Sequence, residues 1–166
     1  IEDDENDLTF LGYFSFSDPL KPTAKKSIQI AEELGVDVKI VTGDSKEVSG
    51  YIAKEIGLIK EATEVVLGEE LNSLSSEEFL KACEEHSVFA RISPQTKYKI
   101  VEALSRKHEV GFLGEGINDA PALKAAHVAI AVESAADVSR EVADIVLMEK
   151  DLNVIIKNLI KLLIDK

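Results

Sequence analysis

The stretch from Val110 to Val132 decides the fold class: it reads Val-Gly-Phe-Leu-Gly-Glu-Gly-Ile-Asn-Asp-Ala-Pro-Ala-Leu-Lys-Ala-Ala-His-Val-Ala-Ile-Ala-Val. Apolar residues at 110–113 and 128–132 predict two strands, and the alanine-rich run at 119–126 predicts a helix between them. Both strands are almost continuously apolar, which is typical of strands buried on both faces in a parallel sheet covered by helices. The loop between the first strand and the helix carries two glycines, two carboxylates and an asparagine.

The same alternation of short apolar strands and helices continues outward from this unit. Further strands are predicted at 36–41, 65–67, 88–90 and 145–147, and further helices beginning near residues 22, 45, 75, 93 and 134. Because strand–helix–strand crossovers are right-handed, these elements predict an α/β fold with a doubly wound, Rossmann-like parallel sheet. In such a sheet the functional site lies at the carboxyl ends of the strands.

Residues at both ends of the chain fit this plan less closely. We expect an acidic lead-in at 1–7, one domain over 8–150 that begins with an extended segment at 8–16, and an amphipathic helix over 151–166. Pro22 is expected at the first position of its helix, where proline is favoured.

Composition narrows the function classes. The chain has 166 residues, 45% of them hydrophobic, and 31 acidic against 19 basic side chains give a net charge of −12. Such an acidic protein is poorly suited to bind nucleic acid or anionic lipid. The single cysteine, Cys83, excludes an intrachain disulfide and a cysteine zinc cage. With no apolar run of about 18 residues to span a membrane, we expect a soluble, cytoplasmic segment.

Polar motifs follow three of the predicted strands, so all three are expected at the same sheet edge. The first is Thr42-Gly43-Asp44, in which a hydroxyl and turn amides before a helix N-terminus suit a phosphate oxygen. Taken alone, this tripeptide is better described as a turn with a helix cap.

The second motif runs from Ala90 to Lys97. Lys97 falls in the first turn of its helix, where a lysine gains nothing from the helix dipole, so it is a candidate to bind a phosphoryl group or a carboxylate. A solvated lysine is the alternative.

The third motif, from Gly114 to Leu123, is the most specific. Glu115 and Asp119 flank Asn118, and such hard oxygen donors suit Mg²⁺. Together the three motifs predict phosphoryl transfer, in which positioning and charge neutralisation dominate. The residues themselves offer no convincing nucleophile.

These motifs, with Asp18-Pro19-Leu20 and the stretch from Ala143 to Leu147, resemble the phosphorylation domain of P-type cation-transporting ATPases. Those pumps belong to the haloacid-dehalogenase superfamily. The resemblance extends over roughly residues 8–159, and the sequence of the motifs is most similar to that of the bacterial magnesium-transporting branch. It implies a portion of an ATP-driven pump that uses Mg²⁺ and ATP, forms an aspartyl phosphate, and is anchored by transmembrane helices absent from these residues.

The resemblance also implies roles for individual residues. Thr42 and Lys97 hold the phosphoryl oxygens, and Asn118 hydrogen-bonds the same group. Gly43, Asp44 and Arg91 lie beside the nucleotide, while Glu115 and Asp119 hold Mg²⁺. Asp18 and Pro19 match the hinge that returns from an inserted nucleotide-binding domain.

Two departures from the family pattern matter. The phosphorylated Asp-Lys-Thr-Gly-Thr motif is not among these residues, so the chain is expected to be the C-terminal part of a split domain that lacks its central strand. The strands near Ile40 and Phe112 would then flank an unfilled position. In addition, Glu115 stands where the family has aspartate. Its extra methylene moves the carboxylate by roughly 1.5 Å, which is expected to weaken Mg²⁺ binding.

The sequence leaves two alternatives open. One is a free-standing phosphatase of the same superfamily with Asp18 as nucleophile, although Leu20 stands where such enzymes carry a second aspartate. The other is an inactive domain that binds a partner, suggested by Glu115 and the missing nucleophile.

Overall fold

The computed structural model describes residues 9–14 and 20–148. The proposed hinge at Asp18 and Pro19 and the helix expected over 151–166 lie outside the described residues, so both stay predictions.

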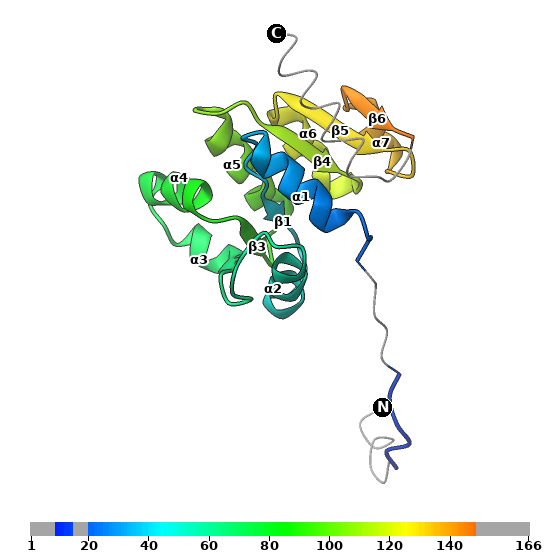
Figure 1. The fold of residues 1–166 in the computed structure, drawn as a ribbon. Coiled ribbons are helices and arrows are strands. Elements are labelled where there is room, and N and C mark those ends of the chain that lie inside the picture. Colours follow the sequence, from blue (N-terminus) through cyan, green and yellow to red (C-terminus); the bar gives the residue numbers. More distant parts are fainter. Residues whose placement is uncertain (1–8, 15–19, 149–166) are drawn as a thin grey trace, which may run out of the picture.

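The described strands form two parallel sheets rather than one (Figure 1). The first sheet has the order β1-β3-β2 and contains β1 (Ile40–Val41), β2 (Val66–Leu67) and β3 (Val88–Ala90). The second has the order β4-β5-β6 and contains β4 (Gly111–Gly114), β5 (Val128–Val132) and β6 (Ile145–Leu147). Every residue of the central strand β3 is buried, as its apolar sequence predicts.

Helices connect and cover these strands. They are α1 (Ala24–Glu33), α2 (Lys46–Glu55), α3 (Gly68–Asn72), α4 (Ser76–Glu85), α5 (Pro94–Ser105), α6 (Ala120–Ala125) and α7 (Asp137–Glu141), with a 3₁₀ turn, η2, at Ile117–Asp119. The parallel α/β class predicted from the sequence is confirmed.

Serine side chains begin three of the helices. Ser45, Ser75 and Ser93 each accept a hydrogen bond from a backbone amide in the first turn of α2, α4 and α5. Because such caps satisfy amides that have no partner within the helix, they fix where each helix begins.

The gap between the two sheets lies at the position where the sequence predicts that a central strand is missing. Among the described residues, β1 and β4 are each the outer strand of their sheet, so the segments near Ile40 and Phe112 each have one open edge. Leu113 of β4 is 42% exposed. The two sheets therefore agree with the prediction that the strands near Ile40 and Phe112 flank an unfilled position.

Several predicted boundaries also need correction. The strand expected over 36–41 forms ladder pairs only at Ile40 and Val41, since β3 alone flanks it. Pro22 precedes the N-cap Thr23 and is not the first helical residue. The described residues 9–14 form no strand, and their large apolar side chains are 80–95% exposed.

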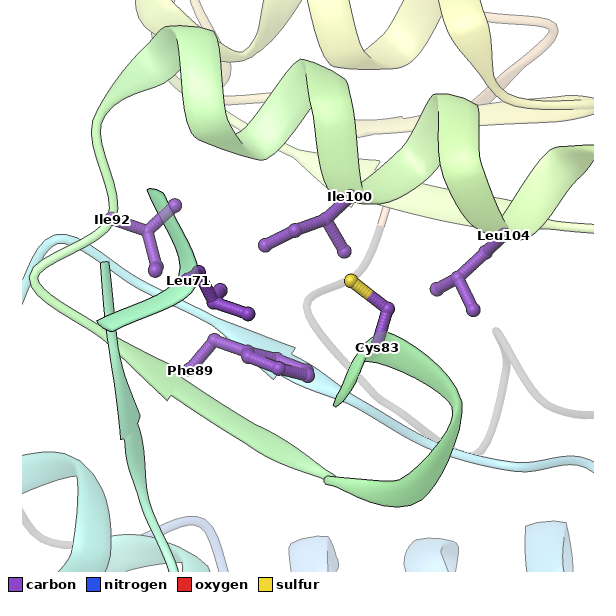
Figure 2. Close-up of a cluster of buried hydrophobic side chains, with 6 residues drawn as sticks. All are labelled: Leu71, Cys83, Phe89, Ile92, Ile100 and Leu104. Carbon is purple, nitrogen blue, oxygen red and sulfur yellow. The ribbon is translucent and has the colours of Figure 1, made fainter. Parts of the chain in front are cut away.

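The largest buried cluster holds α5 against the first sheet. Figure 2 shows Ile100 and Leu104 of α5 directed toward Cys83 of α4 and Phe89 of β3, with Leu71 and Ile92 beside them. Leu71 lies on α3, a short helix that the sequence did not reveal. This packing fixes the first turn of α5, where Lys97 lies.

Within residues 9–14 and 20–148, every helix is too short or too polar to cross a lipid bilayer.

Candidate functional site

Backbone hydrogen bonds join the loops that follow β1 and β3. The amide of Arg91 donates to the carbonyl oxygen of Asp44 (2.9 Å), and the amide of Ile92 donates to that of Thr42 (2.9 Å). The two predicted motifs therefore meet at one edge of the first sheet, as their positions after parallel strands require.

The loop after β1 is closed by its own side chains. Thr42 Oγ1 donates to Asp44 Oδ2 (2.9 Å) and accepts from the Asp44 amide (3.1 Å). Gly43 and Asp44 are exposed. This turn presents a hydroxyl, a carboxylate and a glycine backbone to solvent just before Ser45 caps α2.

Lys97 extends from the first turn of α5 toward the loop after β4. Its Nζ lies 2.7 Å from Asp119 Oδ1, and the two side chains are 17% and 12% exposed. The turn itself is held by Ser93 Oγ, which accepts from the Thr96 amide (3.2 Å). Buried Thr96 also bonds Asn72 of α3. Lys97, which gains nothing from the helix dipole, therefore has a specific carboxylate partner.

Asp119 organises the Gly114-Glu115-Gly116 loop. Its Oδ2 accepts from the amides of Glu115 (3.2 Å) and Gly116 (3.0 Å), while Oδ1 binds Lys97. Burial raises the pKa of this carboxyl, but the Lys97 bond and charge and the two loop amides lower it by more, so the net pKa lies below its ordinary value. Asp119 is therefore an ionised carboxylate at neutral pH.

Gly114 permits this arrangement because a side chain there would collide with Asp119. A Cβ on Gly114 would lie 2.7 Å from Asp119 Cβ, closer than carbon atoms approach. The loop is also supported from α7, where buried Ser139 donates from Oγ to the Gly116 carbonyl (2.7 Å). Nothing in the sequence distinguished Ser139, because a serine within a short polar helix carries no motif.

Glu115 and Asn118 lie exposed on the same loop. The structure thus brings Lys97, Asp119 and the Glu115 loop together at the end of β4, and Thr42, Asp44 and Arg91 together at the ends of β1 and β3. The described residues contain no group of three or more histidine, cysteine, aspartate and glutamate side chains suited to a metal ion.

Comparison with known proteins decides the family. The family model for haloacid dehalogenase-like hydrolases matches residues 1–127. The chain belongs to this family. The superfamily indicated by the sequence motifs is confirmed.

The curated relatives are ion pumps. The chain is 44% identical over 159 residues to "Magnesium-transporting ATPase, P-type 1" of Escherichia coli (strain K12), covering 95% of this chain and 18% of the relative. It is 39% identical over 147 residues to "Calcium-transporting ATPase 1" of Lactococcus lactis, covering 88% of this chain and 17% of the relative. The likeness to P-type ATPases, and to the magnesium-transporting ones in particular, is confirmed.

A solved structure supports the same relationship. A zinc-transporting PIB-type ATPase in the E2.Pi state superposes with a TM-score of 0.65 at 31% identity, over 87% of this chain and 19% of that one. The haloacid dehalogenase-like chain described here therefore spans less than a fifth of each of these pumps.

Proposed function

We propose that this chain is the C-terminal part of the phosphorylation domain of an ATP-driven P-type cation pump of the magnesium-transporting kind. One observation carries the proposal: a threonine hydroxyl, a lysine ammonium and a glycine-bounded carboxylate loop follow β1, β3 and β4 and are held by specific hydrogen bonds. The 44% identity to a magnesium-transporting ATPase supports it.

The chemistry of each side chain suggests its role in the proposed site. Thr42, Lys97 and Asn118 bind phosphoryl oxygens through a hydroxyl, an ammonium and an amide, which stabilise the charge of a transferring phosphoryl group. Gly43, Asp44 and Arg91 contact the nucleotide at the neighbouring loops, whose backbones are joined by the Arg91-to-Asp44 hydrogen bond.

The donor set of the third loop fits Mg²⁺. This ion binds through one or two carboxylates and takes its other ligands from water and phosphate, so Glu115 and Asp119 suffice without a larger cluster. Glu115 supplies the exposed carboxylate, while Asp119 holds the loop through Oδ2 and pairs with Lys97 through Oδ1. When bound, Mg²⁺ neutralises charge on the phosphoryl oxygens.

The open edges of β1 and β4 suit one further parallel strand. We propose that the parent protein supplies it, ending in the Asp-Lys-Thr-Gly-Thr motif, because a parallel strand would bring its terminal aspartate to the same sheet edge as Thr42 and Lys97. The exposed apolar side chains within 9–14 suit coverage by the parent's nucleotide-binding domain. The parent's transmembrane helices complete the proposal, with this segment on the cytoplasmic side.

Complementation tests the proposal directly. The chain is mixed with a second polypeptide carrying an apolar strand that ends in Asp-Lys-Thr-Gly-Thr, together with Mg²⁺ and acetyl phosphate. We expect a hydroxylamine-sensitive acyl phosphate on the second polypeptide only when both parts are present. Lys97→Ala should abolish labelling, whereas Lys99→Ala, an exposed lysine on the same helix, should not.

Two further variants separate the alternatives. Glu115→Asp is expected to lower the Mg²⁺ concentration needed for labelling, since it restores the shorter carboxylate. Phosphatase turnover by the chain alone that disappears with Asp18→Asn would contradict the split-domain proposal. So would a lack of labelling by the complemented Glu115→Asp chain, which would favour an inactive binding domain.

A further inference from the structure

Arg91 has a backbone conformation that non-glycine residues rarely adopt. Its φ of +51° lies in the left-handed region, and it is the one non-glycine residue with positive φ within residues 9–14 and 20–148. This conformation costs an L-residue roughly 1–2 kcal/mol, so surrounding contacts must hold it in place.

Hydrogen bonds hold Arg91 on the side of the β1 loop. Its amide donates to Asp44, and the next amide, that of Ile92, donates to Thr42. Both acceptor carbonyls belong to the proposed nucleotide and phosphoryl loop. These two hydrogen bonds join the left-handed turn at Arg91 to the Thr42-Gly43-Asp44 loop.

Gly68 holds Arg91 on the opposite side. Leu67 pairs with Ala90 in the β2–β3 ladder, which brings buried Gly68, the first residue of α3, against the Arg91 carbonyl. A Cβ on Gly68 would lie 2.6 Å from that oxygen, 3.4 Å from the Arg91 carbonyl carbon and 3.3 Å from Ile92 Cδ1. Glycine is required here by the close approach of two backbones and not by its own φ.

The Arg91 side chain is exposed, and its charge acts on the N-terminus of α2. Glu47, in the first turn of α2, has a lowered pKa, chiefly through hydrogen bonds from its own backbone amide and Ser45, with a smaller contribution from Arg91. The Arg91 charge therefore reaches the first turn of the helix that follows the Thr42-Gly43-Asp44 loop.

We propose that Gly68 is a positioning residue for nucleotide binding. Its missing side chain lets the Arg91 carbonyl approach β2, which fixes Arg91 in the left-handed conformation and presents its guanidinium beside the Thr42-Gly43-Asp44 loop. This inference rests on the proposed function, because it assigns the nucleotide phosphates as the anion that Arg91 binds. No motif in the sequence marked Gly68.

The test uses ¹H–¹⁵N NMR of the 166-residue chain and its Gly68→Ala variant, titrated with ADP. Backbone shifts and the intraresidue amide-to-Hα NOE should report a left-handed Arg91 in the parent chain and its loss in the variant. ADP affinity should fall about tenfold, the value of one charge-assisted hydrogen bond to phosphate. In an Arg91→Ala background, Gly68→Ala should cost no further affinity, because the two changes remove the same interaction.

Gly50→Ala is the matched control. Its Cβ would lie 2.1 Å from the Ala62 carbonyl oxygen, so it introduces a comparable backbone collision away from Arg91. It should lower stability while leaving both the Arg91 conformation and ADP affinity unchanged. An equal loss of ADP affinity in Gly50→Ala and Gly68→Ala would overturn the inference.

Arg91→Gly keeps the inference testable if Gly68→Ala does not fold. Glycine tolerates the left-handed conformation, so this variant should unfold at higher temperature yet bind ADP about tenfold more weakly. Unchanged ADP affinity in Arg91→Gly would contradict the proposal, as would a right-handed Arg91 in the parent chain. Because the nucleotide-binding domain is proposed to belong to the parent protein, the ADP titrations are repeated with that domain added in trans if the 166-residue chain alone binds no ADP. The Arg91 conformation in Gly68→Ala decides the positioning role in either case.

Discussion

Lys97 Nζ lies 2.7 Å from Asp119 Oδ1, and this ion pair ties the helix that follows the first sheet to the loop that follows the second. This ion pair adds to the packing of α5 against α6, which joins the same two halves. Burial of both groups makes the pair costly to break one partner at a time.

Removing the Asp119 carboxylate is expected to destabilise the fold more than removing the Lys97 ammonium. Asp119→Ala leaves a lysine and two loop amides without their acceptor and should cost about 2–4 kcal/mol. Lys97→Met leaves the carboxylate with its two amide donors and should cost about 1–2 kcal/mol. Urea unfolding monitored by circular dichroism measures both.

Lys99→Met is the matched control for the lysine, because Lys99 is exposed on the same helix. Its change in unfolding free energy should stay within about 0.5 kcal/mol. Equal effects of Lys97→Met and Lys99→Met would show that the Lys97 contact contributes nothing.

Acid should weaken the fold partly through Asp119. Its folded pKa is lowered, so its stabilising contribution is complete above the unfolded pKa and is lost as the pH falls through the folded pKa. The unfolding free energy of the wild-type chain should therefore decrease as the pH is lowered below about 4. Asp119→Asn, which cannot titrate, should show a smaller fall over the same range, and identical profiles would contradict the assignment.

Sequence reasoning located most elements and the loops of the site because local signals marked them. The helix starts predicted near residues 45, 75 and 93 fall at the N-caps of α2, α4 and α5, and apolar runs located β3 and β5. Register and contacts between distant segments have no such signal. The short helix α3, the Gly68 approach to Arg91 and the support from Ser139 arise only once β2, β3 and α7 are in place.

The sequence predicted that Asp119 is a metal ligand but did not predict the groups that its carboxylate binds. Oxygen donors around glycines indicated a metal ligand, yet the folded loop engages both carboxylate oxygens with Lys97 and two amides. The spacing of residues in the loop predicts that Asp119 offers oxygen ligands. Which groups those oxygens bind depends on where α5, which carries Lys97, packs.

The capping box of α4 should contribute measurably to stability. Ser75 Oγ lies 2.6 Å from Glu78 Oε2, and the Ser75 amide donates to the same oxygen (3.0 Å). Ser75→Ala should cost about 1 kcal/mol in thermal or urea unfolding, the usual value of an N-cap. Ser76→Ala, one residue later and equally exposed, should be nearly neutral, and a comparable loss there would argue against a capping role for Ser75.

Cys83 offers a probe of the first sheet's core. The side chain is fully buried between α5 and β3 (Figure 2). Burial raises the pKa of its thiol from 9.0 to about 11, with Lys39 opposing and Glu84 adding to the shift. Since the thiolate is the reactive form, iodoacetamide should alkylate the folded chain at pH 8 at least about a hundredfold more slowly than the urea-unfolded chain. Rapid alkylation of the folded chain would contradict the packing in Figure 2.

The same thiol should make the fold weaker in alkali. A group whose folded pKa is raised stabilises fully below its unfolded pKa and loses that contribution as the pH rises through the folded value. For Cys83 the loss should begin near pH 9 and be complete near the folded pKa of about 11. Cys83→Ala removes the titrating group at a cost of about 1–2 kcal/mol for the lost packing, so its unfolding free energy should start lower yet decline less over this range. If the unfolding free energy of Cys83→Ala declined as steeply as that of the unsubstituted chain, the decline would be caused by the titration of tyrosines and lysines instead.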